Sequence, residues 1–316
     1  MSTLSTDSMR RYLSRSISSM NRNKLNGLLA EVDLRQHLAD LGFADRISPG
    51  GWIARKDGPG EFGHQTVVFF PEVILPDTDY PADRIFPAPS HGLHTICATF
   101  HQTGISAYFC AASVPEQNNA EDIMWHAKQL GLPADQPYAR FPDCLTGAFR
   151  RRERNYNFLR YQTDTATIPA HAIAEEYSKE NIRVAFQNSF MAEMSDVDGI
   201  FWGQQFTYPL EIKEKTPAHD RALGDFFGLD LGPFVKLSYY AAKRGNLHSI
   251  FIVREIDSVE DRNLVAWWFI RYEDLAQYAS WIQQGGGRSM IGGQSSVVRV
   301  HKAEFRPLDA ANLRSL

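Results

Sequence analysis

The sequence predicts an α/β protein, α+β overall, in which a mixed central β-sheet flanked by helices follows an N-terminal α+β module. Its 316 residues are 43% apolar, which suffices for one large or two modest domains. Segments with strand and helix periodicity alternate along the second half of the chain. The run from His248 to Ile256 is almost continuously apolar, as is typical of a central strand buried on both faces.

We expect two modules, residues 1–165 and residues 166–316. The first opens with a helix over residues 24–41, because leucines recur there at helical spacing and Gly42 can cap the end. A strand over residues 66–75 follows, interrupted by Pro71.

Two further segments of the first module have strong local preferences. Residues 93–101 and 105–114 are rich in β-branched and aromatic residues and flank a short polar link, so we expect a β-hairpin. Residues 120–130 are expected to be helical, with Gly131 at the end. This module is a possible DNA-recognition domain.

The second module is predicted to start with a helix from Ala170, with Thr167 as its N-cap. Residues 216–224 are polar and are expected to form a loop. The other expected elements are strands at 198–202, 208–215, 248–256, 265–272 and 295–305, a helix from about Pro233, and a helix or turn at 276–283.

One segment of the second module, residues 195–215, concentrates charged side chains within an apolar setting. Period-two alternation places Glu211 and Lys213 on one face of a strand, while Ile212 points to the core. A turn at residues 203–207 would fold this strand back beside Asp198. Two carboxylates and one ammonium would then lie together, although an ordinary edge strand with solvated charges is the alternative.

The proximity of two carboxylates indicates a divalent cation. At about 4 Å they repel by about 4 kcal/mol at an effective dielectric near 20. Mg²⁺ prefers hard oxygen ligands and is often held by one or two carboxylates plus substrate phosphate, so the residues fit Mg²⁺, with Mn²⁺ as a substitute. The chemistry indicated is phosphodiester hydrolysis.

Asp198 followed by Glu211-Ile212-Lys213 resembles the signature of the PD-(D/E)XK nuclease superfamily, with Val197 in place of the proline. The resemblance covers about residues 167–305. It implies that Asp198 and Glu211 bind the metal, that the Ile212 carbonyl can be a third ligand, and that Lys213 positions the attacking water. Glu176, on the preceding helix, stands where the family often places an accessory acid.

The resemblance also implies double-stranded DNA as the substrate, and a type II restriction-like enzyme acting as a homodimer. Basic residues that could contact phosphates are Arg150, Arg151, Arg152, Arg154 and Lys236. An exposed helix face pairing with acids is the alternative for the arginines, and a snorkelling side chain for Lys236. The other function hypotheses are a repair or mobile-element nuclease of the same fold, and a catalytically idle nucleic-acid-binding protein.

Overall charge gives no sign of nucleic-acid binding, because the net charge is −4, so any DNA site must be a local basic patch. The three cysteines have no zinc-like spacing, and no run approaches the ~20 apolar residues of a membrane span. We therefore expect a cytoplasmic protein without a membrane partner.

Overall fold

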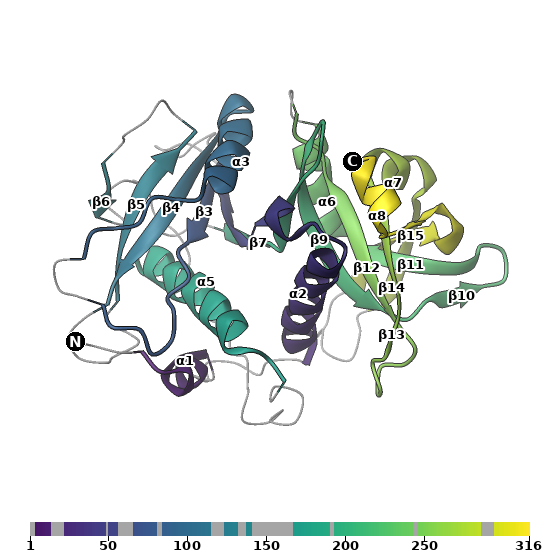
Figure 1. The fold of residues 1–316 in the computed structure, drawn as a ribbon. Coiled ribbons are helices and arrows are strands. Elements are labelled where there is room, and N and C mark those ends of the chain that lie inside the picture. The colour runs from purple at the N-terminus through teal and green to yellow at the C-terminus, as the bar shows by residue number, and fades with distance from the viewer. Residues whose placement is uncertain are drawn as a thin grey trace. The chain divides into compact units, whose positions relative to one another are not determined.

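A computed structural model describes residues 4–13, 22–48, 50–55, 66–80, 84–114, 123–131, 137–140, 167–189, 193–242, 246–285 and 294–316. By its internal contacts the chain divides into two units (Figure 1). Unit 1 comprises Met1–Leu25 and Pro49–Val197, and unit 2 comprises Asn26–Ser48 and Asp198–Leu316. The boundaries of these units therefore differ from the module boundary expected between residues 165 and 166.

Unit 1 contains a six-stranded mixed sheet in the order β6-β5-β4-β3-β2-β7. Only β3 and β4 pair in parallel, and helix α3 connects them. The strands are β2 (Gly51–Arg55), β3 (Thr66–Pro71), β4 (Ile105–Ser113), β5 (Met124–Leu130), β6 (Ala139–Arg140) and β7 (Glu193–Val197). The helices are α1 (Thr6–Leu13), α3 (His91–Gln102) and α5 (Ala170–Ser189).

Helices α3 and α5 cover opposite faces of this sheet. The Trp52 indole N–H donates to the Lys179 carbonyl of α5 over 2.8 Å. Phe70 lies on the other face, and its ring centroid is 6.5 Å from that of Phe100 in α3. Alternating residues of the strands therefore bury against one helix or the other.

The expected hairpin at residues 93–114 is wrong in its first half, because residues 93–101 belong to α3. Ser90 caps this helix, since its hydroxyl accepts from the Leu93 N–H over 3.1 Å. Buried Ile96, Cys97 and Phe100 then fall on one helical face. The β-branched composition misled the prediction, because capping and burial outweigh strand propensity here.

The helix expected over residues 120–130 is also wrong within its described part, because residues 124–130 form β5. Buried Trp125 and Ala127 alternate with the partly exposed His126 and Lys128. This alternation fits the antiparallel pairing of β5 with β4, which supplies the backbone hydrogen bonds.

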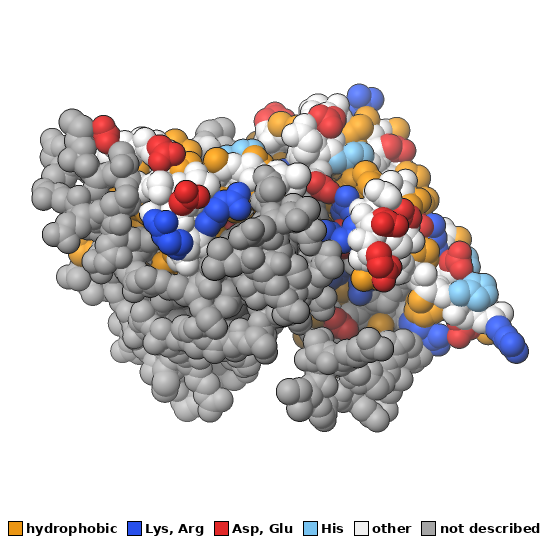
Figure 2. Space-filling model, turned by 90° about the horizontal axis from the view of Figure 1, so that it is seen from below, with side chains coloured by type: hydrophobic (Ala, Val, Ile, Leu, Met, Phe, Trp, Pro, Cys, Tyr) orange, Lys and Arg blue, Asp and Glu red, His pale blue; other side chains and the backbone are white. Residues whose placement is uncertain are grey.

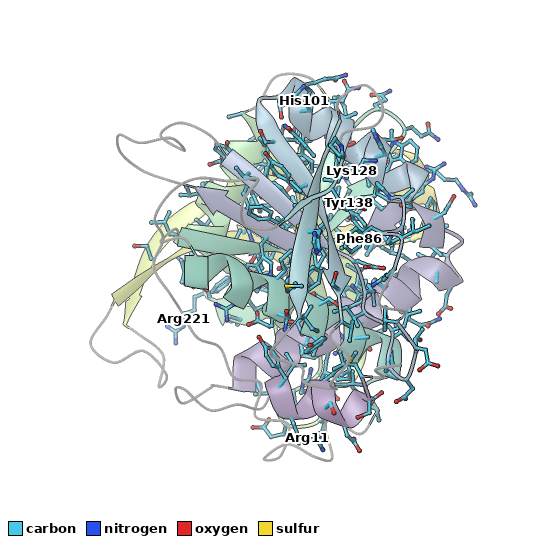
Figure 3. The ribbon with its side chains drawn as sticks, turned by 90° about the vertical axis from the view of Figure 1, so that its left-hand side faces the viewer. Arg11, Phe86, His101, Lys128, Tyr138 and Arg221 are labelled. Atoms are coloured by element: carbon cyan, nitrogen blue, oxygen red, sulfur yellow. The ribbon has the colours of Figure 1, made fainter. Side chains whose placement is uncertain are left out.

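Aromatic rings pack the segment before α3 against the β5–β6 edge of unit 1 (Figure 3). The centroids of Phe86 and Tyr138 are 5.1 Å apart, and the Lys128 ammonium lies 5.9 Å from the Tyr138 ring. The Tyr138 hydroxyl donates to the Pro87 carbonyl over 2.6 Å. Burial raises the pKa of Tyr138 to about 12, so its hydroxyl remains a donor at neutral pH.

Unit 2 contains a six-stranded mixed sheet in the order β1-β8-β9-β12-β13-β16. Its strands are β1 (Ile47–Ser48), β8 (Gly199–Trp202), β9 (Thr207–Lys215), β12 (Ile250–Ile256), β13 (Leu264–Arg271) and β16 (Arg306–Pro307). The central strands β9 and β12 are parallel neighbours, so the chain between them must cross over the sheet. This crossover includes helix α6 (Leu231–Ala241).

A second sheet in unit 2 has the order β10-β11-β15-β14. Its strands are β10 (Ala218–Asp220), β11 (Gly224–Asp230), β14 (Ser280–Gly285) and β15 (Gln294–His301). The loop expected at residues 216–224 therefore contains strand β10. The helix or turn expected at residues 276–283 is instead the end of α7 (Tyr272–Tyr278) followed by β14.

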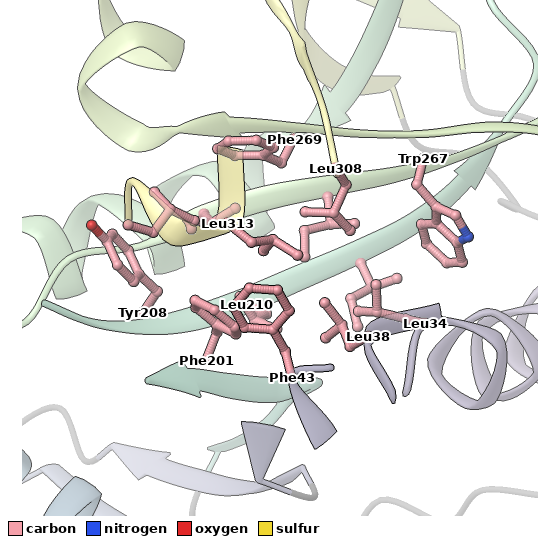
Figure 4. Packing of buried hydrophobic residues seen from close by; sticks show 14 of the residues in the cluster. Leu34, Leu38, Phe43, Phe201, Tyr208, Leu210, Trp267, Phe269, Leu308 and Leu313 are labelled. Carbon is pink, nitrogen blue, oxygen red and sulfur yellow. The ribbon is translucent and has the colours of Figure 1, made fainter. Parts of the chain in front are cut away.

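One face of the large unit 2 sheet packs against helix α2 (Arg22–Asp40) and the short helix α8 (Ala310–Arg314), as Figure 4 shows. Leu34 and Leu38 of α2 share this core with Phe201 and Ile212. The link from α2 to the sheet contains the 3₁₀ turn η1 (Ala44–Arg46), and a second one, η2 (Lys302–Glu304), precedes β16. The burial of α2 here places residues 26–48 in unit 2.

The C-terminal residue lies against the turn between β8 and β9. The Leu316 carbonyl accepts the Gln204 N–H over 3.0 Å. A Cβ atom on Gly203 would lie only 2.4 Å from the same oxygen, so glycine is required for this approach.

The other face of the large sheet packs against α6, α7 and the second sheet. Phe234 and Leu237 of α6 share a core with Phe251 of β12 and Val298 of β15. Helix α6 thus crosses the face of the sheet that carries the odd-numbered residues of β9. None of the helices that the structure describes is long and apolar enough to span a membrane.

Candidate active site

The predicted strand–turn–strand segment at residues 198–215 is confirmed by the pairing of β8 with β9. Gly199 pairs with Leu210, so Asp198 lies at the level of Glu211. The Ile212 N–H donates to Asp198 Oδ2 over 2.8 Å. Asp198 is therefore anchored to the backbone of the strand that carries the other two candidate residues.

The side chains of β9 point to the faces that the sequence predicted. Ile212 is 4% exposed and belongs to the core shared with α2. Glu211 and Lys213 point to the opposite face, where Glu211 is 2% exposed and the Lys213 side chain is 34% exposed. The lysine can thus reach both solvent and the buried carboxylate.

Two ammonium groups contact the Glu211 carboxylate. Lys213 Nζ lies 2.6 Å from Glu211 Oε1. Lys236 Nζ, from helix α6, contacts Glu211 Oε2. Lys236 is itself buried, so its charge is compensated within the fold rather than by bulk water.

The electrostatics keep these groups charged. Burial alone would raise the pKa of Glu211, but the ammonium groups of Lys236 and Lys213 outweigh burial and lower the pKa. Burial alone would lower the pKa of Lys213, but the carboxylates of Glu211 and Asp198 outweigh it and raise the pKa. Glu211 is therefore anionic and Lys213 cationic at neutral pH.

Sequence reasoning missed one further lysine on this face. Lys215 follows Lys213 by two residues, so strand alternation places both on the same side of β9. Burial lowers the pKa of Lys215, and the charge of Lys213 adds to this effect, while Asp230 and Glu211 oppose it. The period-two pattern that selected Glu211 and Lys213 would also have selected Lys215.

Glu176, the expected accessory acid, belongs to unit 1 rather than unit 2. It lies in α5, is buried, and forms an ion pair with Lys179 over 3.5 Å. The structure therefore gathers Asp198, Glu211, Lys213 and Lys236 within one unit and places Glu176 in the other. The expected basic residues Arg150, Arg151, Arg152 and Arg154 lie outside the described residues.

The carboxylates of Asp198 and Glu211 form a small set of hard oxygen donors. No group of three or more His, Cys, Asp or Glu side chains able to hold a metal occurs among the residues that the structure places. Mg²⁺ does not require such a group, since it keeps waters and is often held by one or two carboxylates plus phosphate. The two acids fit this chemistry, provided that an ammonium leaves one oxygen of Glu211.

Comparison with protein-family models, curated proteins and solved structures gave no match to this chain. The functional argument therefore depends on the geometry of unit 2.

Proposed function

We propose that the protein is a Mg²⁺-dependent DNA endonuclease that hydrolyses phosphodiester bonds, with unit 2 as a PD-(D/E)XK-type catalytic core. The observation that carries this proposal is the convergence of Asp198, Glu211 and Lys213 from two adjoining strands. In support of it, β9 and β12 are adjacent and parallel, and α6 lies in the crossover between them; strands β10 and β11 are an addition before α6 that the resemblance does not predict.

Asp198 and Glu211 would hold the metal in this proposal, and the Ile212 carbonyl is the candidate third ligand. A bound Mg²⁺ would neutralise charge on the scissile phosphate and lower the pKa of a bound water. Asp198 needs little reorganisation, because the Ile212 N–H already orients its carboxylate. Lys213 would orient the attacking water and stabilise negative charge that develops on the phosphorane oxygens.

Double-stranded DNA is the proposed substrate, and a homodimer with one active site per strand the proposed assembly. Figure 2 shows acidic and basic side chains interspersed on the described part of one face, rather than a field of one sign. Phosphate contacts are proposed for Arg150, Arg151, Arg152 and Arg154, whereas Lys236, the other expected contact, is buried against Glu211. A type II restriction-like activity is the leading case, and a repair or mobile-element nuclease is the next.

A cleavage assay tests the proposal directly. Plasmid and linear DNA are incubated with the wild-type chain and Mg²⁺, Mn²⁺ or EDTA, alongside Asp198→Asn and Lys213→Met. Metal-dependent cleavage that both substitutions abolish is expected. Asp225→Asn is the matched control, because this exposed carboxylate of unit 2 pairs only with the exposed His219 among the contacts in the structure, and it should cleave like wild type. Cleavage that survives EDTA, or survives both site substitutions, would refute the nuclease.

A catalytically idle nucleic-acid-binding protein is the second candidate function. It is favoured by one observation, the occupation of both Glu211 oxygens by lysine ammonium groups. DNA binding without cleavage under any metal, equal in wild type and Asp198→Asn, would select this candidate.

A further inference from the structure

Lys236 has a relation to Glu211 that the proposed nuclease chemistry does not use. Its ammonium contacts Oε2, the oxygen that Lys213 leaves unoccupied, and its residue is 6% exposed. Glu211 therefore has one ammonium on each oxygen in this structure. The arrangement neutralises a carboxylate that is only 2% exposed.

This arrangement conflicts with metal binding at the same carboxylate. A divalent cation requires one of the Glu211 oxygens and would add two positive charges beside two ammonium groups. Like charges repel strongly where little water screens them. One lysine must therefore withdraw before the metal can bind.

Lys236 is the lysine assigned to withdraw, because the proposed function keeps Lys213 beside the attacking water. Lys213 Nζ lies 2.6 Å from Glu211 Oε1, and the Asp198 carboxylate also favours its charged form. Lys236 extends from α6, a separate element, on a flexible four-carbon stem. A change of side-chain rotamer can move this ammonium without moving strand β9.

We propose that Lys236 is an internal counter-cation that occupies the metal-binding oxygen of Glu211 and is displaced when a divalent metal binds. This inference rests on the proposed function, since it assumes that Glu211 is a metal ligand. Lys236 acts through Glu211 and is thus a positioning residue that lowers metal affinity, not a catalytic residue. The fold gains a neutral, stable site at the expense of tight metal binding.

Calorimetric titration of the full chain with Mn²⁺, without DNA, tests this role. Lys236→Met keeps most of the apolar stem and removes the charge, so it should bind Mn²⁺ on the order of tenfold more tightly than wild type. Lys302→Met is the matched control, because Lys302 Nζ pairs with the buried Glu255 over 2.5 Å at another place in unit 2. Its Mn²⁺ affinity should equal that of wild type. Equal or weaker binding by Lys236→Met would overturn the proposal.

Two further variants locate the effect. Lys236→Arg keeps the positive charge and should not gain affinity. Glu211→Gln in the Lys236→Met background should remove the gain, because the released oxygen is then absent. A gain that persists without the Glu211 carboxylate would show binding elsewhere and overturn the proposal.

Thermal denaturation provides a second measurement if Lys236→Met is less stable. A ligand that binds the folded state raises Tm by mass action, so added Mn²⁺ should raise Tm more for Lys236→Met than for wild type. An equal or smaller rise contradicts the role of Lys236.

The results separate this inference from the proposed function. Mg²⁺-dependent cleavage by wild type, with no affinity gain in Lys236→Met, rejects the counter-cation and retains the nuclease. An affinity gain without any metal-dependent cleavage retains the counter-cation and rejects the nuclease.

Discussion

Strand β9 buries one glutamate on each of its faces, and the two differ in the cations that hold them. Glu211 is held by the lysines Lys213 and Lys236. On the opposite face Glu214, whose side chain is 5% exposed, is held by the arginines Arg254 and Arg262. The same strand thus presents the same buried anion to two kinds of partner.

The arginine cluster is fixed by several hydrogen bonds. Arg262 donates twice to Glu214, from Nε to Oε1 and from Nη2 to Oε2, each over 2.8 Å. Arg254 donates to Glu214 over 3.0 Å and to the Arg262 carbonyl over 3.1 Å. Arg254 also pairs with Asp33 of α2 over 2.7 Å, so the network ties the helix to the sheet.

The difference follows from the chemistry of the two cations. A guanidinium is planar and permanently charged, and it matches a carboxylate through two parallel bonds. A lysine ammonium is a point charge on a flexible stem and can exchange one partner for another. The Glu214 cluster is suited to holding α2 and the β12–β13 turn, whereas the Glu211 cluster is suited to exchanging its contacts, as the proposed function requires.

The largest expected effect separates the two glutamates by activity. Under the proposed function, Glu211→Gln should lower the DNA cleavage rate by roughly 10³-fold, because it removes charge from the reacting centre. Glu214→Gln should retain cleavage per folded molecule, because its side chain points to the other face. Rates are measured by plasmid cleavage and normalised to the folded fraction from circular dichroism. Equal losses in both variants would remove the distinction.

The next effect separates them by stability. Glu214→Gln should lower the free energy of unfolding by about 3 kcal/mol, since it removes the carboxylate charge from the largely buried guanidinium groups of Arg254 and Arg262. Glu211→Gln should cost less, because Lys213 is partly exposed and because the buried Lys236, unlike a guanidinium, can lose its proton. Urea denaturation measures both, and a larger loss for Glu211→Gln would contradict the comparison.

A smaller effect tests the two parallel hydrogen bonds, or fork, that the Arg262 guanidinium donates to Glu214. Arg262→Lys should cost about 1.5 kcal/mol of unfolding free energy, because lysine cannot replace both hydrogen bonds to Glu214. Arg262 also has a positive φ of 58°, so its backbone depends on these contacts. Arg306→Lys, on a half-exposed arginine 3.7 Å from Asp274, is the control and should change stability little. Equal losses at both positions would argue against a special role for the fork.

The smallest effect is expected at the exposed end of the network. Asp33→Asn should lower the unfolding free energy by less than about 1 kcal/mol, because 46% of the Asp33 side chain is exposed. The loss should shrink further at high salt, where exposed pairs are screened. Denaturation at low and high ionic strength measures it, and a loss that does not change with salt would indicate a buried interaction instead.

Sequence periodicity predicted the elements that position the site. Period-two alternation placed Glu211 and Lys213 together, and the continuous apolar run predicted the buried strand β12, which is buried at every position. The sequence-based prediction failed at α3, because the β-branched residues indicated a strand and the Ser90 cap was not considered. It also failed at β10, because the polar residues 216–224 were expected to form a loop, whereas residues 218–220 pair with β11.

The pairing of the site residues could be predicted only in part. A short turn joins the two strands that position Asp198 and Glu211, so the hairpin pattern in the sequence brings these residues together. Lys236 contacts Glu211 only because the crossover carries α6 over the sheet, and a path of that kind has no local sequence signal. Likewise, Arg254 and Arg262 reach Glu214 from neighbouring elements that the alternation pattern does not connect.

The contact of Gly203 with Leu316 has an evolutionary consequence. Any side chain at position 203 would occupy the space of the terminal carbonyl that Gln204 binds. A relative that carries a larger residue in this turn must therefore place the residue equivalent to Leu316 differently. Substitutions in the hairpin of the candidate catalytic acids are thus expected to be coupled to substitutions around Leu316.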